Sequence, residues 1–239
     1  MSIILNGDTG VTYPNGSLSF PALTYAAGTT ALAPVNFQSG TNLTTATAGA
    51  MEYDGLKLMF TPSGAQRGVV PGMQLYRLNS NLVGNNVNTA QAIVGVGCTL
   101  SANTTYAFEY VFAMSKTAGT TTHAIQLGFG GTATITNLSY YNINTFNNSF
   151  IPIAAGGFWA AWIATAAATT VVVPTNTAGL NFFTMSKGTV SIGASGGTFI
   201  PQYTLTAAPG GAYTVQTGAY VLIYPIGASG ANVNVGTWA

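Results

Sequence analysis

Hydrophobic and polar residues alternate along much of the chain after residue 73, and this alternation predicts β-strands with one buried face. The clearest example is the stretch 105–114, in which every second residue is large and apolar. These residues are Tyr106, Phe108, Tyr110, Phe112 and Met114. Bulky side chains at period two predict the core face of a long strand. Glu109 falls on the opposite face, where we expect solvent or a contact with another subunit.

Further strand-like runs follow about a dozen residues apart, with no convincing amphipathic helix between them. We predict them at 74–78, 91–96, 122–129, 134–143, 180–187, 189–192, 199–207 and 214–224. Eight or nine strands from residue 73 onward, at this spacing, predict an all-β, jelly-roll-like antiparallel β-sandwich.

Glycine and proline residues predict where these strands turn or end. Gly130-Gly131 suits a tight hairpin between the strands on either side. The tripeptide 209–211, Pro-Gly-Gly, predicts the turn between the last two strands, and Pro225 predicts the end of the final one.

The stretch 158–173 has two interpretations. Its Ala-rich middle is compatible with a helix, whereas Trp159, Ile163 and the Val run 171–173 favour a strand, which we adopt. Trp159 and Trp162 are three residues apart, so they would face opposite sides of a strand. We expect each in the core or at a subunit interface, with a trimer axis or a sugar-binding surface as the alternative for one of them.

The run 153–173 is apolar enough to raise the question of a membrane span. Gly156, Gly157 and several Thr residues interrupt it, and no Lys or Arg flanks it. We therefore expect no membrane insertion.

Tyr140 and Tyr141 are adjacent in a predicted strand and must project to opposite faces, so one of them should be exposed. We name Tyr140, Trp159 and Trp162 as candidates for surface recognition.

Charge is concentrated between residues 43 and 70. The charged residues there are Glu52, Asp54, Lys57 and Arg67. Asp54-Gly55 separates two β-prone runs and predicts a hairpin with a type I′ turn. Glu52 and Asp54 would share a strand face, which could serve acid–base chemistry or a cation. We favour a structural use, in which Asp54 serves the turn and Glu52 pairs with Lys57 or Arg67.

Residues 1–42 contain only short apolar pieces between turn signals, so we expect this segment to become ordered by docking against something else. Ile3, Ile4 and Leu5 are the predicted anchor. The predicted organisation is an attachment segment at 1–42, a β-hairpin junction at 43–72 and a β-sandwich domain at 73–239.

Charged residues make up only 4% of the 239 residues, whereas an ordinary globular protein has about a quarter. The five Lys and Arg residues are scattered, so no basic patch predicts nucleic-acid binding. A nearly neutral surface favours self-association, and a homo-oligomer converts that tendency into a defined interface. The N-terminus has no cationic lead and does not resemble a secretory signal, so we expect the protein to be made and assembled in the cytoplasm.

Candidate catalytic residues are scarce. A glycosidase needs two suitably placed carboxylates, and no pair among the four acidic residues looks suitable. His123 is the only histidine, and without a nearby second ligand it predicts an ordinary surface or capped histidine instead of a metal site. Cys98 is the only cysteine, which excludes an intramolecular disulfide, and we expect it to be a small buried residue. We predict no enzyme activity, no cofactor and no metal.

Three segments resemble structural proteins of tailed bacteriophages, especially fibre-like and collar-like ones. They are the opening MSIILNGDTGVTYPNGSLS, the stretch SGTNLTTATAGAMEYDGLKLMFTPSGAQRGVV and the ending APGGAYTVQTGAYVLIYPIGASGANVNVGTWA. The similar pieces cover about 80 residues and carry no catalytic signature; the middle, roughly 79–200, depends on pattern alone.

The resemblance implies a virion component assembled in the host bacterial cytoplasm. The first hypothesis is a homotrimeric fibre-like protein whose N-terminus binds other virion proteins of the head, neck or tail and whose sandwich contacts the host surface, with a cell-surface glycan as the candidate ligand. The alternative is a capsid decoration or cement protein that stabilises the head shell. The trimer follows from the resemblance and from the shortage of surface charge.

Overall fold

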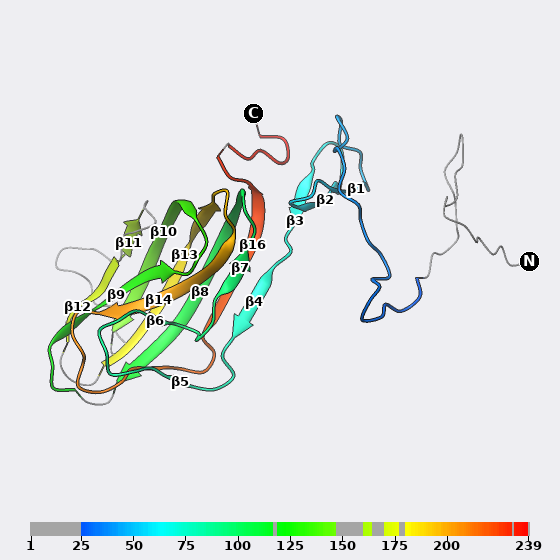
Figure 1. The fold of residues 1–239 in the computed structure, drawn as a ribbon. Coiled ribbons are helices and arrows are strands. Elements are labelled where there is room, and N and C mark those ends of the chain that lie inside the picture. The colour runs from blue at the N-terminus through cyan, green and yellow to red at the C-terminus, as the bar shows by residue number, and fades with distance from the viewer. Residues whose placement is uncertain are drawn as a thin grey trace, which may run out of the picture. The chain divides into compact units, whose positions relative to one another are not determined.

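The computed structural model describes residues 25–116, 119–146, 160–163, 170–176, 180–230 and 232–238 (Figure 1). The chain divides into two compact units, 1–38 and 39–239. In the first unit, the described residues 25–38 form no strand and are all exposed. None of the described residues of either unit lies in a helix.

A small antiparallel sheet of three strands follows the start of the second unit. Its strands are β1 (Met51–Tyr53), β2 (Leu58–Phe60) and β3 (Gly68–Val70). β2 lies in the middle, with Tyr53 opposite Leu58 and Leu58 opposite Val70. The predicted hairpin is confirmed, and β3 extends it into a sheet that the sequence pattern did not predict.

The predicted type I′ turn of this hairpin is wrong. The strands are joined by the four residues 54–57, and only Gly55 of the Asp54-Gly55 pair has a positive φ, +90°. Asp54 still serves the turn, as predicted, because its Oδ1 accepts hydrogen bonds from the backbone N–H groups of Leu56 and Lys57, both at 2.9 Å. An aspartate that bonds its own backbone two and three residues on stabilises this longer loop.

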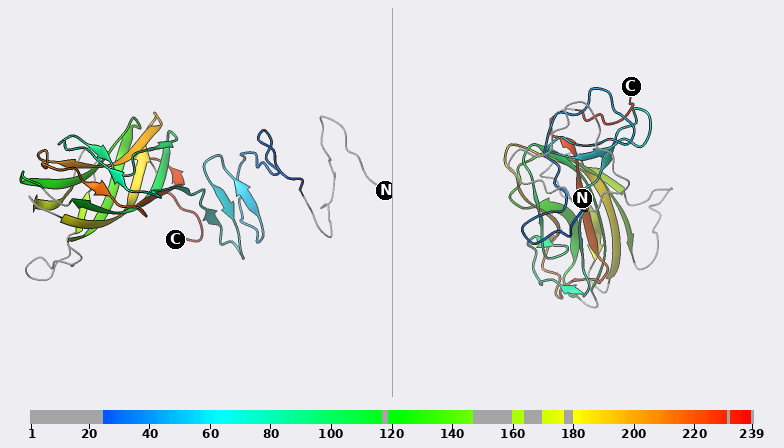
Figure 2. Two further views of the ribbon diagram at one scale, coloured as in Figure 1. Left: turned by 90° about the horizontal axis from the view of Figure 1, so that it is seen from below. Right: turned by 90° about the vertical axis from the view of Figure 1, so that its right-hand side faces the viewer.

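Residues 73–239 contain thirteen described strands, β4 to β16, in two antiparallel sheets that form a sandwich (Figures 1 and 2). The eight-stranded sheet contains β4 (Gln74–Arg77), β5 (Leu82–Val83), β8 (Thr104–Lys116), β10 (Ile135–Phe146), β11 (Ala160–Ile163), β13 (Leu180–Ile192), β15 (Thr214–Val215) and β16 (Tyr220–Ala228). The five-stranded sheet contains β6 (Gln91–Ala92), β7 (Cys98–Leu100), β9 (His123–Gly130), β12 (Thr170–Asn176) and β14 (Gly197–Leu205). The predicted all-β sandwich is confirmed.

The centre of the eight-stranded sheet runs in the order β11-β10-β13-β8. Two strands pair with the other side of β8. β16 pairs with its residues 104–111, and β15 pairs with Met114 and Ser115 near its end. β4 pairs with β16, and β5 pairs with β15. In the five-stranded sheet β14 is flanked by β9 on one side and by β6 and β7 on the other.

The core lies between the two sheets, and the predicted stripe of β8 forms its centre. All five large residues of that stripe are buried. The ring of Phe108 lies 5.2 Å from that of Phe129 on β9 and 5.7 Å from that of Phe199 on β14. Phe129 and Phe199 stack at 4.7 Å between ring centres. Because aromatic contacts join strands of both sheets, this cluster holds the layers together.

The predicted Gly130-Gly131 hairpin is wrong. β9 belongs to the five-stranded sheet and β10 to the eight-stranded one, so these glycines lead the chain from one layer to the other. Gly131 has a φ of +116°, and a side chain there would collide with the backbone carbonyl of Thr198. Glycine is required at this crossing because the two backbones approach closely. A Gly-Gly pair with this role cannot be told from one in a hairpin turn by sequence alone.

Several predicted strand boundaries also change. The two strands predicted at 180–187 and 189–192 form the single strand β13, because Gly188 continues the ladder and lies against Tyr140. Pro225 does not end β16, which continues to Ala228 after a register shift. The stretch 214–224 is divided into β15 and β16, and the stretch 91–96 contributes only β6. The strand interpretation of 158–173 is confirmed for the described residues 160–163 and 170–173.

Candidate functional site

The outer face of the eight-stranded sheet carries large apolar side chains on several adjacent strands. The strand register places residues from β4, β8, β10, β13 and β16 side by side on this face. Its apolar members are Leu75, Val111, Tyr141, Ile143, Phe183, Met185, Tyr220, Leu222 and Tyr224. We call this set the outer apolar face. Each member is exposed or half-buried, and Leu75 is 63% exposed, so apolar surface faces outward across the sheet.

One polar cluster lies in the middle of the outer apolar face. Glu109 of β8 accepts a hydrogen bond from the Tyr220 hydroxyl at 2.5 Å through Oε1, and its Oε2 lies 2.5 Å from the Lys187 ammonium. Glu109 and Lys187 are directly opposite each other in the β8–β13 ladder. Both carboxylate oxygens are therefore engaged within the sheet, and the two charges cancel.

The pKa values of the cluster reflect these contacts. Burial acts to raise the pKa of Glu109, but the hydrogen bonds from Lys187 and Tyr220 outweigh it and hold that pKa below its usual value. The hydrogen bond to Glu109 raises the pKa of Tyr220 to about 12, and the same carboxylate raises the pKa of Lys187. At neutral pH the cluster is thus an ion pair with a neutral tyrosine, which suits structure better than proton transfer.

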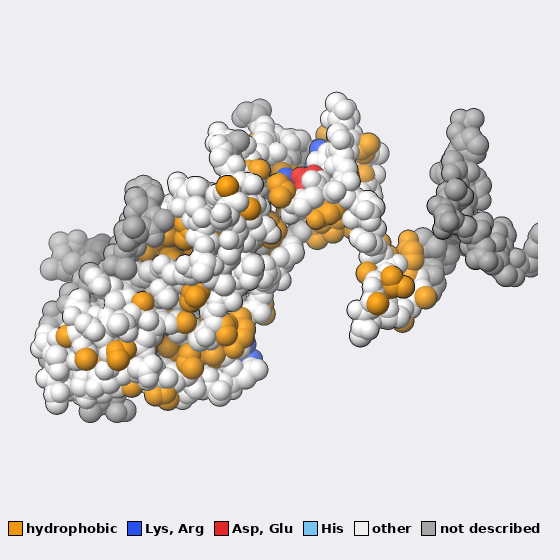
Figure 3. Space-filling view, viewed as in Figure 1, with side chains coloured by type: hydrophobic (Ala, Val, Ile, Leu, Met, Phe, Trp, Pro, Cys, Tyr) orange, Lys and Arg blue, Asp and Glu red, His pale blue; other side chains and the backbone are white. Residues whose placement is uncertain are grey.

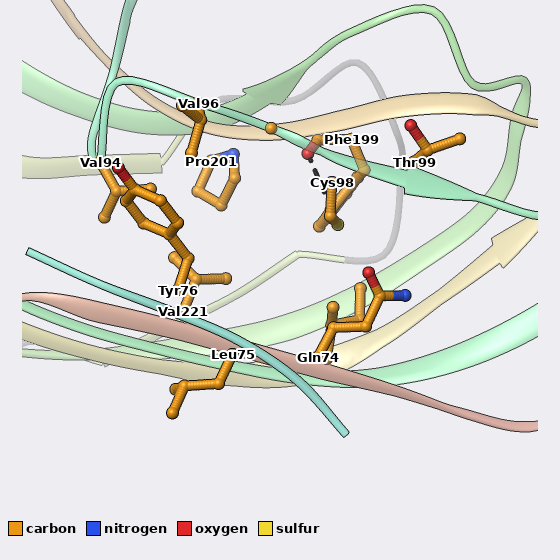
Figure 4. A pocket seen from close by; sticks show the side chains of 12 residues that line it. Gln74, Leu75, Tyr76, Val94, Val96, Cys98, Thr99, Phe199, Pro201 and Val221 are labelled. Atoms are coloured by element: carbon orange, nitrogen blue, oxygen red, sulfur yellow. Dashed lines mark hydrogen bonds between the residues drawn. The ribbon is translucent and has the colours of Figure 1, made fainter. Parts of the chain in front are cut away.

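An apolar cleft of about 390 Å³ opens between the two sheets (Figure 4). Side chains from β4, β16, β7 and β14 and from the segment between β6 and β7 line it. They include Tyr76, Val94, Cys98, Phe199, Pro201 and Ile223. Gln74 and Thr99 are the lining residues with hydrogen-bonding side-chain groups besides Tyr76 and Cys98. The cleft can bury an apolar group, but its lining includes no acid, base or charged side chain.

Cys98 lies in the wall of this cleft. It is half-buried, whereas we predicted a buried residue. Burial raises the pKa of its thiol. The sulfur lies 3.9 Å from the backbone oxygen of Phe199. A thiol with a raised pKa stays protonated at neutral pH, so Cys98 is not set up as a nucleophile.

His123 is buried at the start of β9, so of the two predicted alternatives the surface histidine is wrong, and both ring nitrogens have hydrogen-bond partners, as expected of a capped one. Its Nδ1 lies 2.8 Å from the carbonyl oxygen of Thr121 and its Nε2 lies 2.6 Å from the hydroxyl of Tyr213. A carbonyl can only accept, so Nδ1 carries the proton and Nε2 accepts from Tyr213. Burial lowers the pKa of His123, and the nearby charge of Lys116 lowers it further.

Lys116 lies at the end of β8, beside this histidine. Its ammonium group donates to the carbonyl oxygen of Pro209 at 3.4 Å and lies 5.3 Å from the centre of the Tyr213 ring. Burial lowers the pKa of Lys116 as well. The histidine, lysine and tyrosine together connect β8 and β9 to the loop before β15, which is a structural use of all three side chains.

The charged residues of the small sheet form two separate ion pairs, and Figure 3 shows red and blue side chains gathered beside that sheet. Arg67 Nε lies 2.8 Å from Glu52 Oε2, and Lys57 Nζ lies 2.7 Å from Asp54 Oδ2. Of the two partners predicted for Glu52, Arg67 is therefore correct. Glu52 also accepts a hydrogen bond from the backbone N–H of Leu43 at 2.6 Å, which ties the incoming chain to the sheet.

The predicted recognition residues have mixed outcomes. Tyr140 is only 1% exposed, so its prediction as a surface recognition residue is wrong, whereas its neighbour Tyr141 is 41% exposed. Ile3, Ile4, Leu5 and Trp159 lie outside the described residues. Trp162 lies in β11 with its backbone opposite Tyr141, and its side chain is outside the description.

The sequence reasoning missed the outer apolar face as a candidate. Leu222 and Tyr224 were recognised as part of a strand, and alternation within 220–224 was a usable signal. However, Val221 and Ile223 alternate with them and are equally apolar, so the pattern did not indicate which set faces outward. Only the pairing of β16 with β8 decides it.

Within the described part of the chain, no group of three or more His, Cys, Asp or Glu residues could hold a metal ion. A search of the same residues for a membrane-spanning helix finds none.

Comparison of the chain with protein families, with curated proteins and with solved structures finds no match. The functional argument therefore depends on the geometry described above, and the resemblance to virion proteins stays a prediction.

Proposed function

We propose that this chain is a structural component of a tailed bacteriophage virion: a homotrimeric, fibre-like protein. In this proposal the segment 1–42 attaches to other virion proteins, and the jelly-roll-like sandwich contacts the host surface, with a cell-surface glycan as the candidate ligand. Assembly takes place in the host bacterial cytoplasm. The role is carried by shape and association, without catalysis.

The observation that carries the proposal is the missing core of the three-stranded sheet. Among residues 39–73, Met59 is the only buried hydrophobic side chain. Large apolar side chains of the same stretch are exposed instead, namely Leu43, Met51, Leu56, Phe60, Val70 and Met73. Three strands of three residues each cannot hold their fold on such a small core. Packing against sister chains would supply the missing burial.

The segment 25–38 supports the same conclusion independently. Every residue in it is exposed, and four of them are large and apolar. They are Tyr25, Leu32, Val35 and Phe37. An extended segment that keeps such side chains in water needs a partner surface, which fits attachment to a larger particle.

The carboxylates also favour a structural role. Each of the three acidic residues in the described part of the chain, Glu52, Asp54 and Glu109, is held by its own Lys or Arg. A carboxylate committed to an ion pair is poorly placed to act as a general base, because the pair stabilises its ionised form.

A capsid decoration or cement protein is the alternative proposal. The exposed apolar segment 25–38 fits it as well, because such a protein would bury that segment against the shell lattice. The two proposals differ in location and in what the sandwich does.

Analytical ultracentrifugation of the full chain at micromolar concentration tests the first proposal, with three times the chain mass as the expected result. A strict monomer would contradict it. Imaging of the particle that carries the protein then separates the alternatives: density at the tail or neck supports the fibre, and density spread over the head lattice supports decoration. Deleting residues 1–42 should abolish incorporation into the particle while the purified protein stays folded.

A further inference from the structure

We propose that the outer apolar face is the surface through which copies of this chain pack against one another, with the Glu109–Lys187–Tyr220 cluster at its centre. This inference depends on the proposed trimer and names the residues that form its interface within the sandwich. The partner is a second copy of the same chain.

The outward apolar side chains of this face indicate that a partner covers it. The apolar side chains of β16 alternate with those of the core, so Tyr220, Leu222 and Tyr224 face outward while Val221 and Ile223 are buried. Phe183 of β13, 40% exposed, extends the same surface. A contiguous apolar patch of this kind on a sheet marks an interaction site, because solvated sheet faces normally carry polar side chains.

The outward side of the four central strands is large enough for a stable interface. β8 and β13 each have 13 residues, which at about 3.3 Å per residue gives a length of roughly 43 Å. The four neighbouring strands β10, β13, β8 and β16 at about 4.8 Å spacing add a width of roughly 19 Å. The resulting area of roughly 800 Å² is that of the whole outward side of these four strands, of which the outer apolar face is the middle, and it equals the contribution of one partner to a standard-sized protein interface. An interface of that size would therefore have an apolar centre and a polar margin.

The charges of the face indicate a copy of this chain as the occupant. Both oxygens of Glu109 are already engaged by Tyr220 and Lys187, so the ion pair can be covered without leaving a carboxylate unpaired. A strongly charged partner would find only the single charge of Arg77, at the β4 margin, beside the neutral Glu109–Lys187 pair. A second copy brings the same apolar surface with a neutral ion pair at its centre.

The margin of the face suggests how the copies close into a ring. Leu75 lies on β4, opposite Leu222, at the free edge of the sheet. If the margin at Leu75 packs against the β13 region of the next copy, around Phe183, the contact is between two different patches. Such a heterologous contact repeats around an axis and closes into a cyclic oligomer when the rotation is right.

Cysteine cross-linking in the full chain tests the inference. Cys98 is the only native cysteine, so Cys98→Ala removes the background; circular dichroism checks its fold. Leu75→Cys and Phe183→Cys are then introduced together and treated with a short bis-maleimide. We expect covalent dimers and trimers on a denaturing gel. The matched control combines Leu75→Cys with Thr204→Cys, which lies on the outer side of the five-stranded sheet, and should give no linked species.

The ion pair provides a second readout by sedimentation. Glu109→Gln leaves Lys187 without its partner inside the covered face, so we expect subunit dissociation at concentrations at least about tenfold higher than for the wild type. Adding Lys187→Met should restore association, because no unpaired charge is then left under the partner. Thr204→Gln is the surface control and should change nothing.

The outcomes separate this inference from the proposed function. If the protein is trimeric, but both cysteines of the Leu75–Phe183 pair react fully with a monofunctional maleimide and form no links, the outer apolar face is not the interface and the trimer stands. If the wild-type chain is a monomer, both proposals fail. Protection of these cysteines only on binding to a capsid shell would also overturn the inference, because the occupant would then be a shell protein.

Discussion

The two sheets of the sandwich share one core but differ in their outward faces. The outward residues of β9 and β14, in the five-stranded sheet, are small or polar for the most part. They are Ala124, Gln126, Gly128, Thr198, Ile200, Gln202 and Thr204. In the eight-stranded sheet, the outward positions in the middle of β13 and β16 are Phe183, Met185, Tyr220, Leu222 and Tyr224, with the Glu109–Lys187 ion pair among them. Towards its ends β13 turns Asn181, Thr189 and Ser191 outward as well.

This difference shows how a chain with so few charges can stay in solution without associating through every face. Glutamine and threonine provide enough hydrogen bonding to water to keep one face solvated, and no charge is needed there. The middle of the other face has only the Glu109–Lys187–Tyr220 cluster, whose groups bond to one another, and its Thr and Ser side chains lie towards the strand ends. In the proposed trimer this asymmetry would direct association to one side of the sandwich, whereas a uniformly neutral surface would associate without direction.

The largest expected effect concerns the core that both sheets share. Phe108→Ala removes a ring that contacts Phe129 and Phe199 of the opposite sheet, and we expect the free energy of unfolding to fall by about 4 kcal/mol. Urea denaturation at fixed protein concentration measures it. Ala107→Ser, one residue away on the outward side, is the control and should cost less than about 1 kcal/mol. Equal losses would mean that the inner and outer sides of β8 are not distinguished as described.

A smaller effect is expected from the buried histidine of the five-stranded sheet. The pKa of His123 is below its ordinary value of about 6.5, so the unfolded chain binds this proton more readily than the folded one. Stability that is fully present above pH of about 6.5 should be lost as the pH falls towards the folded pKa. Thermal melts between pH 7 and pH 5.5 check this, because ordinary carboxyl groups titrate mainly below that range, near pH of about 4.

His123→Gln is the control for the pH effect. This variant lacks the titrating ring and should be less stable at pH 7, but its stability should not decline between pH 7 and pH 5.5. Tyr213→Phe removes the hydroxyl bonded to Nε2 and should cost about 1 to 2 kcal/mol at neutral pH. A wild-type protein whose stability rises on acidification would contradict the assignment of a neutral, buried histidine.

The smallest effect tests the two outward faces directly with nearly isosteric substitutions. Val111→Thr places a hydroxyl in the outer apolar face and should cost about 1 kcal/mol if a partner covers it. Thr204→Val makes the reverse change on the five-stranded sheet and should stay within about 0.5 kcal/mol of the wild type. Denaturant titrations at two protein concentrations measure both. If neither substitution changes the free energy of unfolding, both faces are equally solvated.

Period-two alternation was sufficient to predict the strands and the core face of β8. It worked there because every inward residue is bulky and the outward residues are mostly small. It failed at Tyr140, which shares its inward side with the buried residues Asn142 and Asn144. A face with two asparagines looks solvent-exposed in sequence, and only the hydrogen bonds of the folded chain, such as that between Thr184 and Asn144, make its burial tolerable.

Other parts of the structure depend on partners that are distant in sequence. The partner of His123 is Tyr213, ninety residues further on, and no local pattern connects them. The crossing at Gly131 required glycine because of its closeness to Thr198, which local turn rules cannot distinguish from a hairpin. The outer apolar face likewise emerges only from the register of β16 on β8.

The free edge of β4 has a consequence for handling the protein. Among the described strands β4 pairs only with β16, and it carries exposed Leu75 on one face and exposed Tyr76 on the other. An unpaired apolar edge is a template for non-native strand addition, the first step of aggregation, and a charge such as that of Arg77 acts as a gatekeeper against it. Replacing Arg77 by an apolar residue should therefore lower the yield of soluble protein while leaving the melting temperature almost unchanged.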